Sequence, residues 1–223
     1  MKTLLIIPAF NEEASIVRVV EGVVAAGYDY VVVNDGSTDH TTDICRAHGF
    51  RFIDLPANLG LAGAFQAGIK YARMRGYDCA VQFDGDGQHK VEYVARLIDA
   101  LDGCDIAIGS RFVDEGKPHN LRMLGSSLIS AMVRLTTGKR LTDPTSGMRA
   151  YGPRAIEELA VGPNLGPEPD TLAYLMRKKG ITVSEVQVEM GERLAGESYL
   201  NLKSSGAYMM RMALSVLVMQ FFR

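Results

Sequence analysis

Short apolar runs alternate with amphipathic segments along the first half of the chain, and this alternation constrains the fold more than any other feature. Most positions within the runs are apolar, which is typical of parallel strands that are buried on both faces. We predict strands at residues 4–7, 30–33, 50–55, 79–83 and 105–109, with helices at 12–26, 41–48, 60–75 and 91–101 between them. The alternation predicts an α/β fold, with a mostly parallel, Rossmann-like sheet flanked by helices.

The second half of the chain is less regular. A helix is predicted at residues 123–137, where leucine and alanine recur at helical spacing, and a loop at 162–169, which is rich in glycine and proline. Alternating apolar and polar side chains predict a strand at 181–188. We therefore expect one domain over residues 1–200, followed by a helix rich in Met and Leu within 201–223.

This last helix has two interpretations. Its apolar stretch, residues 213–222, has about half of the ~20 residues that a membrane-spanning helix needs. The helix either packs against its own domain, as Met-rich segments commonly do, or docks on a membrane surface or a partner protein.

Composition excludes several classes of protein. Hydrophobic residues make up 47% of the chain and charged residues 22%, as in globular rather than disordered proteins. The net charge of -2 and the lack of basic blocks argue against a nucleic-acid partner. Cys45, Cys79 and Cys104 have no paired spacing, so we expect buried, inert thiols in a reducing compartment. Pro8 ends the first apolar run, so we expect no signal peptide and a cytoplasmic location.

Polar clusters follow four of the predicted strands, and ligands bind at the carboxyl ends of strands in sheets of this kind. The most informative cluster is Asp84-Gly85-Asp86-Gly87-Gln88. Two carboxylates one residue apart on a tight turn can reach one hard cation, and their oxygens suit Mg²⁺ or Mn²⁺. A site with only two carboxylates fits a metal ion that is shared with substrate phosphates. Taken alone, the same residues also fit a solvated Asp-Gly turn.

Together the clusters resemble the inverting family 2 glycosyltransferases, which have the GT-A fold, and within them the dolichyl- and polyprenyl-phosphate sugar synthases. The resemblance covers about residues 3–200. It rests on the following segments: Ile7-Pro8-Ala9-Phe10-Asn11-Glu12-Glu13, Asn34-Asp35-Gly36-Ser37-Thr38-Asp39, Asn58-Leu59-Gly60, Asp84 to His89, Gly109-Ser110-Arg111, Asp143-Pro144-Thr145-Ser146-Gly147-Met148-Arg149, and Arg193 with Gly196-Glu197-Ser198.

The resemblance implies a nucleotide-sugar donor, linked to UDP or GDP, and a divalent metal ion. Asp84, Asp86 and Gln88 would hold the metal ion against the donor diphosphate. The other residues that the resemblance assigns to the donor are Pro8, Phe10 and Glu12, which would line the nucleotide pocket, and Asp35, which would accept a hydrogen bond from the base. The chain departs from the family at Asn34, where an aspartate is usual.

For the acceptor, the resemblance implies a polyprenyl phosphate at the cytoplasmic face of a membrane. Arg111, Arg122 and Ser126 would hold its phosphate, and Arg193 and Ser198 would close over the phosphates. Family members often carry transmembrane helices beyond this point. The chain ends without them, so we expect peripheral attachment or a small membrane protein as partner.

Three other functions and the roles of several residues stay open. One of these functions is that of a nucleotidyltransferase, which would release pyrophosphate instead of a nucleoside diphosphate. The acceptor could instead be a carbohydrate hydroxyl, which needs a carboxylate base; Asp143 is a candidate for that catalytic role, or else a turn aspartate before Pro144. The chain could also be a nucleotide-binding subunit whose activity depends on a partner. His89 is either a neighbour of the metal site or a solvated loop histidine, and we assign Glu168 no catalytic role.

Overall fold

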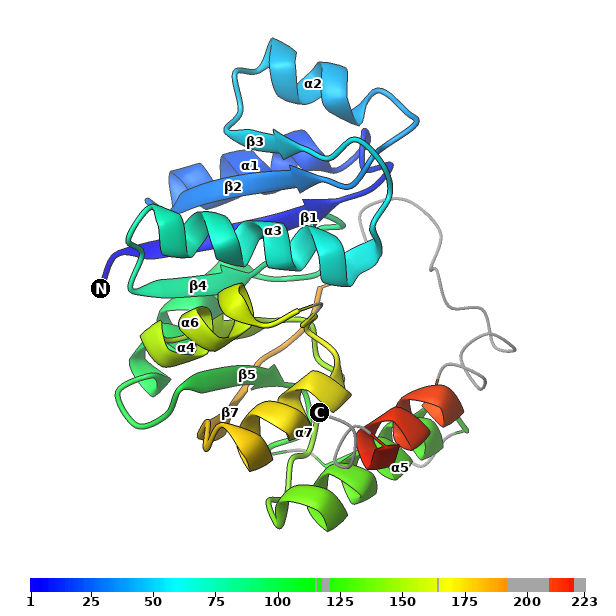
Figure 1. Cartoon of the computed structure of the whole chain (residues 1–223). Coiled ribbons are helices and arrows are strands. Elements are labelled where there is room, and N and C mark those ends of the chain that lie inside the picture. The colour runs from blue at the N-terminus through cyan, green and yellow to red at the C-terminus, as the bar shows by residue number, and fades with distance from the viewer. Residues whose placement is uncertain (115, 118–120, 164, 192–208, 219–223) are drawn as a thin grey trace.

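The computed structural model describes residues 1–223 except 115, 118–120, 164, 192–208 and 219–223. Seven strands form one sheet in the order β3-β2-β1-β4-β6-β5-β7 (Figure 1). The strands are β1 (Thr3–Ala9), β2 (Asp29–Asn34), β3 (Phe52–Asp54), β4 (Cys79–Gln82), β5 (Ile106–Ser110), β6 (Arg149–Tyr151) and β7 (Val183–Gln187). All neighbouring pairs are parallel except those of β6, which runs antiparallel to both β4 and β5. The predicted α/β fold with a mostly parallel sheet is confirmed.

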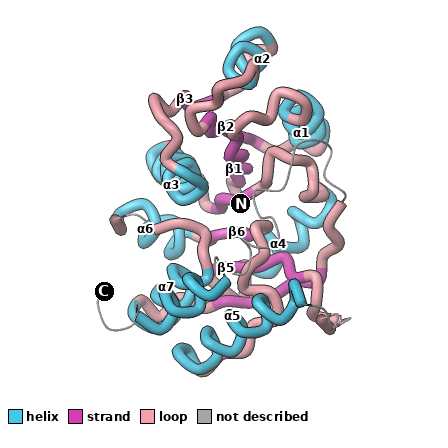
Figure 2. The backbone as a smooth tube through the Cα atoms, turned by 90° about the vertical axis from the view of Figure 1, so that its right-hand side faces the viewer, coloured by secondary structure: helices cyan, strands magenta, loops and turns pink. Residues whose placement is uncertain are grey.

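Helices cover both faces of this sheet, as the side view in Figure 2 shows. The helices are α1 (Ile16–Ala25), α2 (Thr41–Ala47), α3 (Gly60–Met74), α4 (Val94–Ala100), α5 (Leu121–Thr137), α6 (Pro153–Val161) and α7 (Pro169–Lys178), with a 3-10 turn at Val91–Tyr93. Residues 209–218 are also helical. None of the helices that the structure describes is both long enough and apolar enough to span a bilayer.

The central strand β1 explains why both faces need a cover. Its side chains alternate between the two faces, so Leu4 and Ile6 join one core cluster with α3, α6 and α7. Leu5 and Ile7 join a second cluster with α1 and α4. All four side chains are fully buried, which accounts for the continuous apolar run in the sequence.

The cysteines lie within this packing. Cys45 and Cys79 are fully buried, and burial raises the pKa of Cys45 to about 11 and that of Cys79 to about 12. Burial also raises the pKa of Cys104, and all three thiols are free. The predicted burial is confirmed for Cys45 and Cys79, whereas Cys104 is only partly buried. A raised pKa favours the protonated, unreactive form of a thiol near neutral pH.

The structure corrects several predicted boundaries. The first helix begins at Ile16 rather than at residue 12, because Asn11 has a positive φ of 57° and a turn follows it. The third strand has only three residues. Three elements, β6, α6 and α7, were not predicted. Helix α7 begins at Pro169, so the predicted loop ends one residue earlier.

Candidate active site

The loops after β1 and β2 are joined by hydrogen bonds. The Asn11 backbone N–H donates to Ser37 Oγ at 3.0 Å, and the Thr38 N–H donates to Asn11 Oδ1 at 2.8 Å. The Glu12 N–H donates to Thr41 Oγ1, and the Glu12 carboxylate accepts from Ser15 Oγ at 2.6 Å. These hydrogen bonds hold Pro8, Phe10 and Glu12, which we predicted to line the nucleotide pocket, at the carboxyl edge of the sheet.

Asp35 lies at the same edge and is only 4% exposed. Its Oδ1 accepts a hydrogen bond from the Leu59 backbone N–H at 2.7 Å. No other hydrogen bond to this carboxylate is found among the described residues. The next residue, Gly36, has a φ of 66°, and a Cβ there would lie 2.7 Å from the backbone of Ala57 and Asn58. Glycine is therefore required at position 36 for this close approach of two loops.

Asn34, the departure from the family pattern, has a structural explanation. Its amide nitrogen donates to Thr42 Oγ1 and to Asp54 Oδ1, each at 2.7 Å, and Asp54 also pairs with Arg46 at 3.0 Å. An aspartate in this buried position would be unable to donate and would face a second carboxylate. The amide suits the neighbouring Asp54.

The acidic turn lies directly against the end of β1. A Cβ on Gly85 would lie 3.0 Å from the Pro8 carbonyl oxygen, so any larger residue there would crowd the backbone of β1. The Gln88 N–H donates to Asp86 Oδ1 at 2.9 Å, and Asp86 is 6% exposed. The side chain of Asp84 is 35% exposed.

His89 orients Asp84. It is buried, and its Nδ1 accepts the Asp84 backbone N–H at 2.8 Å while its Nε2 lies 3.4 Å from Asp84 Oδ2. Because Nδ1 is an acceptor, Nε2 carries the proton and faces the carboxylate. The interpretation of His89 as a solvated loop histidine is wrong, since its ring is buried and binds the backbone of the acidic turn at Asp84.

The residues of this turn fit a hard divalent cation. Asp84, Asp86 and Gln88 offer oxygen atoms, which are the ligands that Mg²⁺ and Mn²⁺ prefer, and the side chain of Asp84 is 35% exposed. The described residues contain no group of three or more His, Cys, Asp or Glu side chains that would form a closed cage. The set therefore suits a metal ion that completes its shell with water and with ligand oxygens.

Arg111 and Asp143 form an ion pair at the end of β5. Arg111 Nε and Nη2 donate to the two oxygens of Asp143 at 2.7 and 3.0 Å, and Thr145 Oγ1 donates to the same carboxylate. Asp143 is fully buried, whereas the Arg111 side chain is 37% exposed. Such a bidentate pair fixes the guanidinium plane and leaves its outer edge accessible.

The segment that follows Asp143 connects this pair to the acidic turn. Ser146 Oγ donates to the Gly109 carbonyl oxygen, and buried Arg149 donates to the carbonyl oxygens of Ser146 and Pro144. A Cβ on Gly147 would lie 3.0 Å from Asp84 Oδ2. The predicted metal-binding turn and the Arg111–Asp143 pair therefore flank one continuous segment.

Two polar side chains of β7 hold the backbone around Arg111. Glu185 accepts the backbone N–H groups of Thr142 and Asp143, each at 2.6 Å, and the Thr142 hydroxyl at 2.9 Å. Gln187 Oε1 accepts the N–H groups of Val113 and Asp114 at 2.9 and 3.1 Å. The alternation that predicted this strand therefore also places polar groups where they fix two irregular segments.

Ser126 is buried on α5, where it accepts a hydrogen bond from Lys117 Nζ at 3.0 Å. Lys117 also donates to Ser130 Oγ at 2.9 Å. Burial lowers the pKa of Lys117, while the nearby Asp143 and Glu185 oppose that shift. A second cation therefore stands beside Ser126, on the same side of the site as Arg111.

Some predicted residues lie outside the described part of the chain. Arg193 and Ser198 fall within residues 192–208, and the side chain of Arg122 is not described although its backbone belongs to α5. The structure brings together the other predicted residues in two groups. Pro8, Phe10, Glu12, Asp35, Asp84, Asp86 and Gln88 lie at or just beyond the carboxyl ends of β1, β2 and β4, and Arg111, Ser126 and Asp143 lie beyond β5.

Sequence analysis missed Lys117 and Glu185. Lys117 lies in a connecting segment whose sequence has neither a helical nor a strand pattern. The glycine before it and the proline after it in the sequence indicate a turn, but they do not indicate a function. Glu185 occupies a polar position of an alternating strand, which is ordinarily a solvated position. Only the packing of residues 142–143 against β7 gives it a partner.

Comparison with known proteins gives the family. Residues 4–160 match the model of glycosyl transferase family 2. The chain is 32% identical over 223 residues to the polyprenol monophosphomannose synthase of Mycolicibacterium smegmatis, covering 90% of this chain and 81% of the relative. It is 34% identical over 217 residues to the undecaprenyl-phosphate mannosyltransferase of Micrococcus luteus, covering 90% and 88%.

Solved structures agree on the fold. A glucosyl-3-phosphoglycerate synthase from Mycobacterium tuberculosis, in complex with Mn²⁺ and UDP-glucose, matches with a TM-score of 0.72. The match covers 98% of this chain and 78% of that chain at 20% sequence identity. The family match and the shared architecture lead to one conclusion: this chain belongs to the family 2 glycosyltransferases and has their GT-A fold.

Proposed function

We propose that this enzyme transfers a sugar from a nucleotide-sugar donor to a polyprenyl phosphate, with inversion at the anomeric carbon. One observation carries the proposal. The side of the site after β5 presents the cations Arg111 and Lys117 and the hydroxyl of Ser126. Asp143 is the only fully buried carboxylate there among the described residues, and Arg111 donates a hydrogen bond to each of its oxygens. The relatives from Mycolicibacterium and Micrococcus, whose names specify polyprenyl or undecaprenyl phosphate, support it.

In this proposal, the first group of residues binds the donor. Asp35 accepts a hydrogen bond from the base through its second oxygen, and Pro8, Phe10 and Glu12 line the nucleotide pocket. Asp84, Asp86 and Gln88 hold Mg²⁺ or Mn²⁺ against the diphosphate. When bound, this ion acts as a Lewis acid that stabilises negative charge on the leaving nucleoside diphosphate. His89 holds the Asp84 carboxylate in place.

The second group binds the acceptor. A phosphate monoester has its second pKa near 6 and is ionised near neutral pH, so it attacks the anomeric carbon without a general base. It needs cations that align it, and Arg111 offers a fixed guanidinium edge for that purpose. Lys117 and Ser126 add donors, and we propose that Arg122, Arg193 and Ser198 complete the phosphate contacts.

Asp143 has a different role from a base in this proposal. It is fully buried and bound by Arg111, which makes it unsuited to take a proton from an acceptor hydroxyl. We assign it the positioning of Arg111.

A second candidate, transfer to a carbohydrate hydroxyl, is favoured by one observation. Burial raises the pKa of Glu168, the residue directly before α7, and a carboxyl group with a raised pKa is a candidate general base. Our sequence analysis assigned this residue no such role.

Acceptor assays with Arg111→Lys test the proposal. The lysine keeps the positive charge near Asp143 but loses the two-pronged hydrogen bonding. We expect the KM for polyprenyl phosphate to rise at least about tenfold, equivalent to about 1.4 kcal/mol, while the KM for the donor stays within twofold. Arg154→Lys is the control, because Arg154 pairs with Asp105 near the opposite end of β5 through one nitrogen, Nη1, which donates to both carboxylate oxygens. An oligosaccharide product with no lipid-linked product would favour the second candidate.

The location follows from the acceptor. A polyprenyl phosphate resides in a membrane, so we propose that the enzyme works peripherally at the cytoplasmic face, alone or with a small membrane protein as partner.

A further inference from the structure

The outer face of α5 is unusually apolar for an exposed helix. Leu124 and Leu135 are 71% and 72% exposed, and Leu128 is also exposed. Positions 124, 128, 131 and 135 lie on one face, because their spacings of four, three and four residues follow the helical period. Contiguous exposed apolar side chains of this kind mark contact surfaces.

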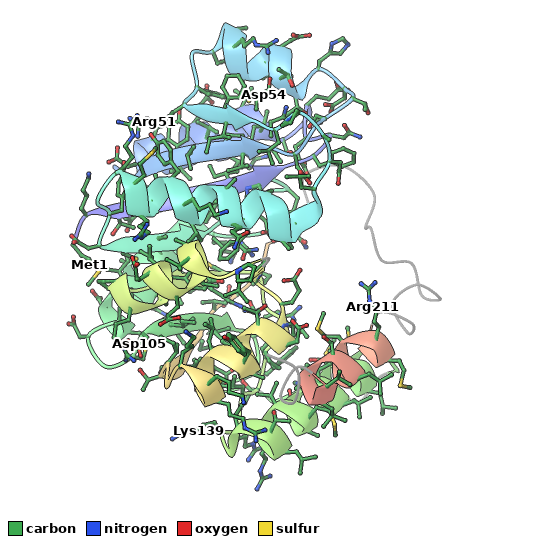
Figure 3. All side chains as sticks on the ribbon, viewed as in Figure 1. Met1, Arg51, Asp54, Asp105, Lys139 and Arg211 are labelled. Carbon is green, nitrogen blue, oxygen red and sulfur yellow. The ribbon has the colours of Figure 1, made fainter. Side chains whose placement is uncertain are left out.

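The same part of the chain is basic. Residues 116–142 contain five Lys or Arg residues and no Asp or Glu, although the whole chain has a net charge of -2. Three of these cations are Arg134, near the end of α5, with Lys139 and Arg140 just beyond it. In the described part of the chain none of the three forms an ion pair with a carboxylate. Figure 3 shows Lys139 at this end of the molecule, far from Arg51 and Asp54.

A cavity of about 930 Å³ connects the apolar face to the acceptor side of the site. Its lining combines cations and hydroxyls with apolar groups, and none of its lining residues is acidic. Lys117 and Ser130 contribute from the side of Arg111, while Arg134, Leu135 and Arg140 contribute from the outer side. Because Ala131 and Leu135 belong to both the apolar face and the cavity, the two features are continuous.

The helix of residues 209–218 extends this region. A Cβ on Gly125 of α5 would lie 2.7 Å from Met209 Cγ, and Met212 and Val216 are buried in the core cluster that contains Ile129. The two helices lie side by side in Figures 1 and 3. On its other side this helix exposes Met210, Leu214 and Val218, and residues 209–218 contain no acidic residue.

We propose that the outer face of α5, with its basic C-terminal end, docks on the surface of an anionic phospholipid bilayer. The leucines enter the boundary between headgroups and acyl chains, and Arg134, Lys139 and Arg140 contact the phosphate groups. The proposal rests on the proposed function, since it names the surface on which the lipid acceptor is met. Docking there places the open side of the cavity against the bilayer, so that a lipid phosphate can enter toward Lys117.

Vesicle co-sedimentation without donor or acceptor tests the surface directly. Phosphatidylcholine vesicles with and without phosphatidylglycerol are the probes. We expect at least tenfold stronger partitioning onto the anionic vesicles at low salt, and a decline as the ionic strength rises. The double variant Leu124→Glu, Leu135→Glu should lower partitioning at least tenfold. Arg134→Glu with Arg140→Glu should abolish the preference for phosphatidylglycerol.

The matched control is Val24→Glu with Met74→Glu, which places the same charges on exposed apolar positions of α1 and α3. It should change partitioning less than twofold, and thermal unfolding should show that each variant is folded. Equal partitioning of wild type and the Leu124, Leu135 variant would overturn the proposal, as would dimer formation through this face without vesicle binding. A water-soluble, short-chain polyprenyl phosphate separates the proposed function from the proposed docking surface. If it is not a substrate, the proposed function is wrong, and the docking surface is still tested independently by vesicle binding.

Discussion

The two halves of the site are built differently. After β1, β2 and β4, the donor half lies in loops that follow regular parallel strands, with glycines at Gly36 and Gly85, where a Cβ atom would lie 2.7 and 3.0 Å from backbone atoms of a neighbouring segment. After β5, the acceptor half consists of irregular segments that are fixed by side chains. Glu185 and Arg149 each bind two backbone groups there, and Gln187 binds four.

This difference suggests how each half tolerates change. Regular parallel strands place the donor-side loops at one edge of the sheet, whichever residues fill the loops. The acceptor half depends on a few buried polar contacts, and removing one leaves backbone groups without partners. Substitutions in the acceptor half should therefore alter acceptor binding without altering nucleotide binding.

The largest effect is expected from Glu185→Ala. It removes three hydrogen bonds and leaves two backbone N–H groups unpaired beside a fully buried aspartate. We expect the free energy of unfolding to fall by about 2–4 kcal/mol and the KM for the acceptor to rise, while UDP affinity stays within twofold. Denaturant unfolding and calorimetry measure these quantities.

Two further variants sharpen that result. Glu185→Gln keeps one acceptor oxygen and should lose less stability. Glu189→Gln changes an exposed carboxylate that pairs only with Lys90 among the described residues, so it should be nearly neutral. Equal loss of nucleotide and acceptor binding in Glu185→Ala would show that the two halves are not separable.

A smaller effect is expected from Asn34→Asp on the donor side. The variant cannot donate to Asp54 or Thr42, so we expect a loss of about 1–3 kcal/mol at pH 7. The loss should shrink as the pH falls, because protonation of one carboxyl group restores a donor and removes the repulsion. Asn58→Asp is the control, since Asn58 only accepts a hydrogen bond, from Gly60, among the described residues. Equal losses in both variants would contradict this explanation.

The smallest effect concerns pH. Burial lowers the pKa of Lys117, so its charge is lost at a lower pH than that of an ordinary lysine, whose pKa is about 10.4. Acceptor affinity should therefore fall as the pH rises through this lowered pKa. Stability of the free enzyme should rise between the lowered and the ordinary pKa, because there the unfolded chain binds more protons. Lys117→Arg should hold its acceptor affinity over this range, and parallel pH profiles for both proteins would count against the role of Lys117.

The fold could be predicted from the sequence more completely in the donor half than in the acceptor half. The strands before residue 110 are apolar on both faces and have turn residues at their ends, so their positions and the cluster at Asp84 could be predicted. The strand β6 has three residues, Arg149, Ala150 and Tyr151, which form no recognisable pattern. Its place depends on β4 and β5, because β6 lies between these two strands and pairs with both.

Individual site residues show the same limit. Arg111 ends a strand, and its position at the ligand edge could be inferred. Its pairing with Asp143, 32 residues away, and the support from Glu185 are set by tertiary packing. From the sequence alone, Asp143 could equally be a general base or a turn residue. The two hydrogen bonds that it accepts from Arg111 are what distinguish these roles.

The central claim is that the turn from Asp84 to Gln88 binds a divalent metal ion together with the diphosphate of the donor. Calorimetric titration of UDP and GDP into the enzyme, with Mn²⁺ and then with EDTA, tests it most directly. We predict metal-dependent binding of at least one nucleotide that is lost in Asp84→Asn with Asp86→Asn and kept in Asp102→Asn, an exposed control. Binding of equal strength in the double variant, or no binding of either nucleotide to the intact enzyme with metal present, would contradict the claim.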